Sequence, residues 1–137
     1  MSLTEEGYQQ AIKALKKCIS PRGMYASGVP EGYTSIWSRD SNISLLGGAL
    51  VKNRFRSAFK NTLNTLAKNQ SVLGQVPNAV GLYDPLRKSD VTYNTIDSSL
   101  WFIIGARVYE KSYANTDAFL KKLKPHIEQA FKWVQFR

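Results

Sequence analysis

The feature that most constrains the fold is a pair of helical segments without a polar face. Residues 41–51 and 98–109 are apolar almost all the way round a helix, and such a helix is expected to be surrounded by protein. Three other segments, 4–19, 54–68 and 117–136, carry apolar residues at three- and four-residue spacing, with charged residues on the opposite side of the helix. Those three helices should each bury one side only. The alternation of outer and inner helices predicts an all-α fold built from helical hairpins.

The length and composition are those of one globular domain. The chain has 137 residues, of which 43% are hydrophobic and 21% charged, so we treat residues 1–137 as a single domain with one core. No run of about 18 uninterrupted apolar residues is present, so we expect no membrane-spanning helix and no membrane partner. The first residues lack the basic and then apolar profile of a secretory signal, and we expect a cytoplasmic protein.

The net charge of +9 is spread along the chain. Lys and Arg form no run of five or six, and on the helices they lie opposite the apolar stripe, as on a solvated face. We therefore expect no nucleic-acid partner. The excess positive charge is also compatible with a larger molecule in which an acidic segment balances it. With one histidine, His126, and one cysteine, Cys18, we expect no metal site.

Two long segments without periodicity, 20–40 and 69–95, each lead into one of the inner helices. Connections of this length in a compact domain are usually functional. An aspartate stands at each junction, Asp40 before the first inner helix and Asp97 before the second. Two inner helices that begin side by side would place both carboxylates at one rim. The sequence therefore predicts a shared site there.

Both aspartates also allow a purely structural interpretation, because an aspartate at a helix start can be an N-cap worth about 1 kcal/mol. Against this, Asp40 is accompanied by Trp37 and Arg39, and an aromatic platform, a guanidinium and a carboxylate together suit a sugar ring. The helix dipole lowers the pKa of Asp97, whereas desolvation by neighbours such as Trp101 raises it. The sequence leaves open which of the two dominates.

Three motifs, in this order along the chain, resemble segments of the six-hairpin glycosidases. Residues 37–41, Trp-Ser-Arg-Asp-Ser, resemble the W-x-R-D-S segment of glucoamylase-type enzymes. Residues 74–78, Gly-Gln-Val-Pro-Asn, resemble the G-x-[IV]-P-N loop of the same group. Residues 93–102, Tyr-Asn-Thr-Ile-Asp-Ser-Ser-Leu-Trp-Phe, resemble the amylo-α-1,6-glucosidase part of glycogen-debranching enzymes, and neutral invertases have a similar D-S-x-x-W-W stretch. The resemblance implies an (α/α)6 toroid, of which this chain would form about five of the twelve helices.

The resemblance also implies a role for each matching residue. Asp97 would be the general acid that protonates the glycosidic oxygen. Arg39 and Asp40 would bind the non-reducing-end sugar at the cleavage subsite, with Trp37 beside them. The remaining substrate-binding candidates, which would line the subsite or shape its rim, are Trp101, Pro77, Asn78 and Tyr93.

The family implies an inverting, exo-acting glycoside hydrolase that acts on α-glucans or oligosaccharides without a cofactor. Inversion needs a general base about 6.5–9.5 Å from the acid, and in the family this base is a glutamate of the C-terminal half. We expect the chain to be the N-terminal part of such a catalytic domain, inactive alone, and to self-associate or to bind a complementary C-terminal half. Two alternatives remain: a non-catalytic carbohydrate-binding or regulatory module of the same fold, and a helical interaction domain whose aspartates are only caps.

Overall fold

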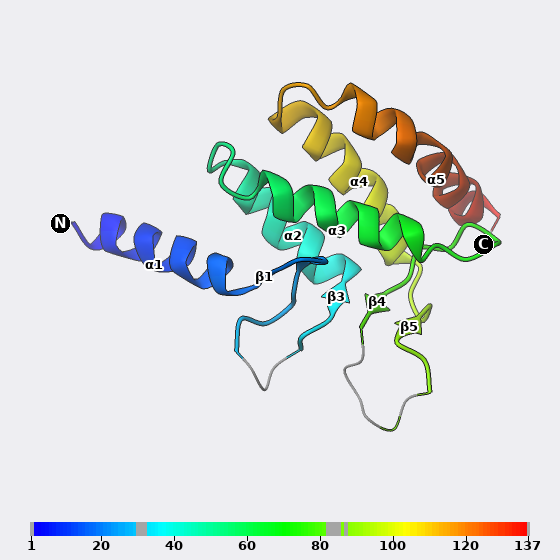
Figure 1. Ribbon diagram of the computed structural model, residues 1–137, viewed down its shortest axis with the longest axis horizontal. Helices are drawn as coiled ribbons and strands as arrows, with labels where there is room; N and C mark the ends of the chain where they lie inside the picture. The colour runs from blue at the N-terminus through cyan, green and yellow to red at the C-terminus, as the bar shows by residue number, and fades with distance from the viewer. Residues whose placement is uncertain (1, 30–32, 82–85, 87, 137) are drawn as a thin grey trace.

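Five α-helices dominate the computed structural model, which describes residues 2–29, 33–81, 86 and 88–136 (Figure 1). The helices are α1 (Leu3–Lys17), α2 (Ser38–Ala49), α3 (Arg56–Lys68), α4 (Asp97–Ser112) and α5 (Asp117–Gln135). Each coincides with a segment that periodicity predicted, and the observed ends lie within three residues of the expected ones. The prediction of an all-α fold that forms part of a toroid of helical hairpins is confirmed.

Short strands occur in both of the long connecting segments, where the sequence shows no period. β1 (Ile19–Ser20) and β2 (Gly23–Met24) form an antiparallel pair. The strands of a second, three-stranded sheet are β3 (Ile36–Trp37), β4 (Ala79–Val80) and β5 (Val91–Thr92), with β4 in the middle. Residues 30–32, 82–85 and 87 of these segments lie outside the described residues.

The three-stranded sheet explains why two helices far apart in the sequence begin together. β3 and β5 are each antiparallel to β4, so they run parallel to one another. β3 leads directly into α2, and β5 leads into α4 after residues 93–96. As a result α2 and α4 leave the sheet in the same direction and pack against each other, with both N-termini at the sheet (Figure 1). The prediction that the two inner helices are neighbours with their N-termini on one side is confirmed.

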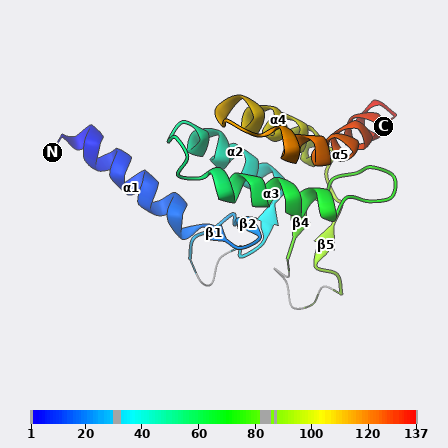
Figure 2. The ribbon, with the colours of Figure 1, turned by 45° about the horizontal axis from the view of Figure 1, so that its top comes forward.

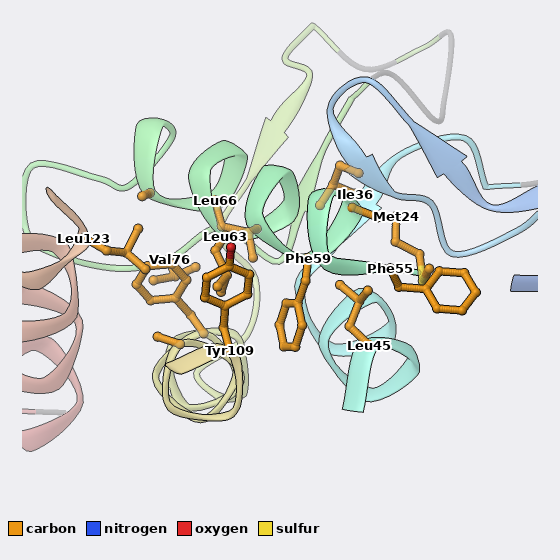
Figure 3. Packing of buried hydrophobic residues seen from close by; sticks show 14 of the residues in the cluster. Met24, Ile36, Leu45, Phe55, Phe59, Leu63, Leu66, Val76, Tyr109 and Leu123 are labelled. Carbon is orange, nitrogen blue, oxygen red and sulfur yellow. The ribbon is translucent and has the colours of Figure 1, made fainter. Parts of the chain in front are cut away.

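The hydrophobic core lies between α3 and the pair formed by α2 and α4 (Figure 3). Phe59 and Leu63 of α3 are fully buried, together with Leu45 of α2 and Tyr109 of α4. The rings of Phe59 and Tyr109 meet edge to face, with centroids 5.6 Å apart. α5 then packs along α4 and buries Leu123. The core therefore fixes the mutual position of the two helices that carry the predicted site.

The expectation that the inner helices are buried all round is wrong for the part of the chain described. On α2 the buried face holds small and polar residues such as Ser41 and Asn42, whereas Ile43 on the other side is 45% exposed. On α4, Leu100 and Ile104 are 43% and 44% exposed. The physical reason is that α3 covers one side of the α2–α4 layer and leaves the opposite side open.

The two outer helices at the ends of the chain also depart from expectation. α1 projects from the body of the molecule (Figures 1 and 2), and Ile12 is its one buried residue. Its apolar stripe is therefore largely uncovered; Tyr8, for example, is 49% exposed. From the sequence, Pro125 is expected either to kink this helix or to start a second one; it lies inside α5, which continues through it as one helix, so the expectation of a second helix is wrong.

Two kinds of structural feature are not found among the described residues. No helix there combines the length and the apolarity needed to cross a membrane. Nor do three or more His, Cys, Asp or Glu side chains gather in that part of the chain in a way that could hold a metal ion. His126 is instead half-buried, and its Nδ1 forms a 2.8 Å hydrogen bond with Gln70 Oε1.

Candidate functional site

A cavity of about 170 Å³ lies where the three-stranded sheet meets the N-termini of α2 and α4. Its lining consists of Trp37, Arg39, Asp40, Asn78, Thr95, Asp97 and Ser98. Asp40 and Asp97, which are far apart in the sequence, thus line the same cavity. The cavity combines an aromatic ring, a guanidinium and two carboxylates with neutral hydrogen-bonding groups.

Backbone and serine hydrogen bonds build this end of the fold. The Ser38 hydroxyl donates to the backbone carbonyl of Ser98 at 3.0 Å, which ties the first turn of α2 to that of α4. The Ser38 amide donates to the carbonyl of Asn78 at 2.9 Å, so the β3–β4 pairing extends into the helix start. Asn78 Oδ1 in turn accepts from the amide of Asn94 at 2.8 Å. These bonds hold the segments on either side of the cavity in a defined relation.

Neither aspartate is an N-cap. The N-cap of α2 is Trp37 and that of α4 is Ile96, and neither helix has a side-chain cap hydrogen bond. Asp40 is the third residue of α2, and Asp97 is the first residue of α4. The structural interpretation of both residues as caps is therefore wrong, and with it the observation that favoured a helical interaction domain.

Asp97 is held as a carboxylate by Arg39. The Arg39 Nε donates to Asp97 Oδ2 at 2.6 Å, and the two side chains are 57% and 29% exposed. This hydrogen bond is the largest influence on Asp97 and lowers its pKa below the usual range. Burial acts in the opposite direction, and a hydrogen bond from Thr95 adds to the lowering. The same bond raises the pKa of Arg39. A neighbouring guanidinium, a contribution not considered from the sequence, thus outweighs desolvation.

Trp37 stands between this cavity and a second one. Its half-buried ring meets Tyr33 edge to face, with centroids 5.6 Å apart and an angle of 87° between the planes. Trp37 and Asp40 also line a cavity of about 280 Å³ together with Tyr33 and Ala26. Tyr33 is not among the candidates from the sequence, although it stands four residues before Trp37.

Three of the sequence candidates are not among the described residues that line the smaller cavity: Pro77, Tyr93 and Trp101. Pro77 is buried beside Asn78. The Tyr93 hydroxyl donates to the carbonyl of Asn69 at 2.6 Å, at the end of α3. Trp101 is half-buried one turn along α4 from Asp97. The lining thus holds Trp37, Arg39, Asp40, Asn78 and Asp97 of the residues named from the sequence.

Two lining residues were missed as site residues by sequence analysis. Thr95 Oγ1 and Ser98 Oγ lie 2.6 Å apart, on the two sides of Asp97 in the sequence. The signal that marks them is the excess of small hydroxyl residues beside both aspartates, which exceeds what a helix start needs. Ser38 belongs to the same pattern, because its hydroxyl joins the two helices.

The match to known proteins agrees with this geometry. A family model described as amylo-alpha-1,6-glucosidase matches residues 13–135. The chain belongs to the amylo-alpha-1,6-glucosidase family. The match covers α2, α3 and α4 completely and includes every residue of the cavity. The resemblance to the glycogen-debranching group is confirmed, and the region is glycoside hydrolase-like, for which the family implies a carbohydrate substrate. Comparisons with curated proteins and with solved structures found no match.

Proposed function

We propose that this chain provides the sugar-binding subsite and the general acid of an inverting, exo-acting glycosidase. Its substrates are α-glucosides such as oligosaccharides derived from glycogen or starch, and it works in the cytoplasm without a cofactor. The observation that carries the proposal is the convergence of Trp37, Arg39, Asp40 and Asp97 on one cavity at the paired N-termini of α2 and α4. Family membership supplies the reaction class.

The subsite offers complementary contacts for a sugar ring. The face of Trp37 suits the apolar C–H face of a pyranose. Asp40 is exposed and carries acceptor oxygens for sugar hydroxyls, and Arg39 has five N–H donors, of which the one at Nε is engaged by Asp97. Charge-assisted bonds of this kind are stronger and shorter than neutral ones. Asn78 stabilises the rim on which these groups are placed.

In the reaction Asp97 gives its proton to the glycosidic oxygen while water attacks the anomeric carbon from the opposite face. An inverting enzyme places the base that activates this water about 6.5–9.5 Å from the acid. The described residues that line the cavity include no glutamate. We therefore propose that residues 1–137 act as the N-terminal part of a six-hairpin catalytic domain, and that a complementary C-terminal half supplies the glutamate.

Sugar binding by the chain tests the first half of this proposal. Titration with maltose and isomaltose, followed by the NMR signal of the Trp37 indole N–H, should show binding that Asp40→Asn weakens. Asp97→Asn should leave binding largely in place, because a proton donor acts in the transition state. The matched control is Asp117→Asn, an exposed aspartate in the first turn of α5. Absence of binding to both sugars would refute the subsite.

Hydrolysis by an assembly that contains the complementary half tests the second half. Asp97→Asn should lower turnover by about 10²–10⁴-fold, the usual contribution of a positioned proton donor. Asp40→Asn should weaken both binding and turnover. Near-normal turnover in Asp97→Asn would show that another group is the acid.

A non-catalytic carbohydrate-binding module is the second candidate, and one observation favours it. The hydrogen bond from Arg39 lowers the pKa of Asp97, which is the opposite of what a general acid needs. A binding module requires the subsite but no proton transfer. The two functions therefore differ in whether Asp97 becomes protonated when sugar is bound.

A further inference from the structure

We propose that Arg39 is a positioning residue that keeps Asp97 as a carboxylate in the empty site and releases it when a sugar enters. This inference rests on the proposed function and deepens it, because it states how a paired aspartate becomes a proton donor. It is carried by the geometry of one ion pair inside the cavity that the sugar must occupy.

The ion pair occupies the space that the sugar needs. Arg39 comes from the first turn of α2 and Asp97 from the first turn of α4, and their 2.6 Å contact joins the two sides of the cavity. The cavity measures about 170 Å³ and both side chains line it. A sugar hydroxyl that accepts a hydrogen bond from the Arg39 Nε therefore competes directly with the Asp97 carboxylate for that donor.

Arg39 can leave Asp97 without becoming isolated. Its side chain is 57% exposed, so a change of rotamer does not disturb the core. Asp40 lies close enough to raise the pKa of Arg39 through its charge, and it provides a second counter-charge. The charged groups that line the cavity together with Asp97 are Arg39 and Asp40, both from α2. Among the described lining residues, those from the other elements are neutral: Trp37, Asn78, Thr95 and Ser98.

Release of Arg39 changes which contribution dominates the pKa of Asp97. The guanidinium bond is the largest contribution that lowers the pKa, and burial is the contribution that raises it. When the bond is broken and the sugar displaces water, burial increases while the lowering is left mainly to Thr95. The carboxylate then takes up a proton from solvent, and this proton is the one later donated to the glycosidic oxygen. Sugar binding is therefore coupled to proton uptake, so affinity should increase as the pH falls through the pKa of the sugar-bound state.

The first experiment measures the pKa of Asp97 by carbon NMR of its side-chain carboxyl in the 137-residue chain. Arg39→Leu should shift the pKa upward, and Arg39→Lys should shift it less, since it keeps the charge. The matched control is Arg107→Leu, which removes an exposed ion pair with Glu110 on the same helix as Asp97. An unchanged pKa in Arg39→Leu, or an equal shift in Arg107→Leu, would overturn the inference.

The second experiment repeats the titration with saturating maltose or isomaltose, where saturation is read from the Trp37 indole signal. Wild type should show an upward shift of the Asp97 pKa on binding, and Arg39→Lys a smaller one. Binding with an unchanged Asp97 pKa would overturn the release step and leave the proposed subsite intact. Absence of binding would instead refute the proposed function, and the release step with it. The Arg39→Leu result then still decides whether Arg39 controls Asp97 in the empty site.

Discussion

Replacing Gly105 by alanine would force a methyl group into the contact between α4 and α2. A Cβ atom at Gly105 would lie 2.0 Å from Asn42 Oδ1 and 3.0 Å from Asn42 Cγ. Asn42 is fully buried, and its Nδ2 donates to the backbone carbonyl of Ser38 at 2.7 Å. The amide therefore has to give up this hydrogen bond or the two helices have to separate.

Three contributions determine how much Gly105→Ala lowers the free energy of unfolding. Overpacking a core contact costs about 1–3 kcal/mol, and leaving a buried amide unpaired costs about 1–3 kcal/mol. Alanine is better than glycine inside a helix by about 1 kcal/mol, which offsets part of this. We expect Gly105→Ala to lower the free energy of unfolding by about 3 kcal/mol, a large share of the roughly 5–15 kcal/mol of a typical domain. Since the same contact sets the spacing of α2 and α4, the Arg39–Asp97 pair should also weaken.

Equilibrium unfolding in urea, followed by circular dichroism, measures this effect. The control is Gly47→Ala on α2, where a Cβ would meet nothing within 4 Å, so it should stabilise by about 0.5–1 kcal/mol. Combining Gly105→Ala with Asn42→Ala removes the clash, and the double variant should lose less stability than the two single changes together. The reasoning is refuted if Gly105→Ala proves as stable as wild type or as Gly47→Ala.

Two further predictions each concern one side chain, Asp97 and Tyr113. Folding lowers the pKa of Asp97, so its contribution to stability is present above the ordinary pKa of 3.8 and is lost as the pH falls through the lowered value. The urea midpoint should therefore drop as the pH falls from 3.8 through the lowered value, and less in Arg39→Leu; an identical drop in both proteins would contradict the assignment. The buried Tyr113 hydroxyl has no hydrogen-bond partner in the part of the chain described. Tyr113→Phe should accordingly leave stability unchanged or increase it by up to about 1 kcal/mol in the same assay, and a clear loss would reveal a missed partner.

The helices were predictable because each spans several turns, so their period is repeated often enough to be read. Their pairing was also predictable, since Asp40 and Asp97 stand at equivalent points before two segments of the same unusual character. Family membership was likewise predicted, from motifs that carry these aspartates and their neighbours. The prediction worked best where a pattern repeats along the chain.

The parts that escaped prediction depend on contacts between distant residues. Strands of two residues, such as β3 and β5, carry no period, although they align the helices that bear the site. The bond from Arg39 to Asp97 depends on a rotamer and on the spacing of two helices, neither of which a sequence pattern encodes. The expected all-round burial of the inner helices failed for a related reason. Apolar character shows that Ile43 can be buried, but not which segment covers it.

The uncovered apolar side of the α2–α4 layer should make this chain associate weakly with itself. Its members include Ile43 and Leu50 of the α2 region and Leu100 and Ile104 of α4, exposed by 43–88%. Burying a large aliphatic side chain completely is worth about 1.5–3 kcal/mol, so covering these partly exposed ones gives roughly 1 kcal/mol each. A two-fold pair that joins like faces would gain about 8 kcal/mol before the cost of association, which is at least about 4 kcal/mol.

The favourable free energy of association that is left after this cost corresponds to a Kd near 1 mM, so association should be visible only at high concentration. The net charge of +9 opposes it, and added salt should strengthen the pair by screening this repulsion. Sedimentation at several hundred micromolar protein should show a larger average mass in high salt, and Leu100→Asn with Ile104→Asn should abolish the increase. Val72→Asn is the control, because Val72 is fully exposed in the turn after α3. A mass that stays monomeric at every salt concentration, or an increase that Val72→Asn removes equally well, would show that this face does not drive association.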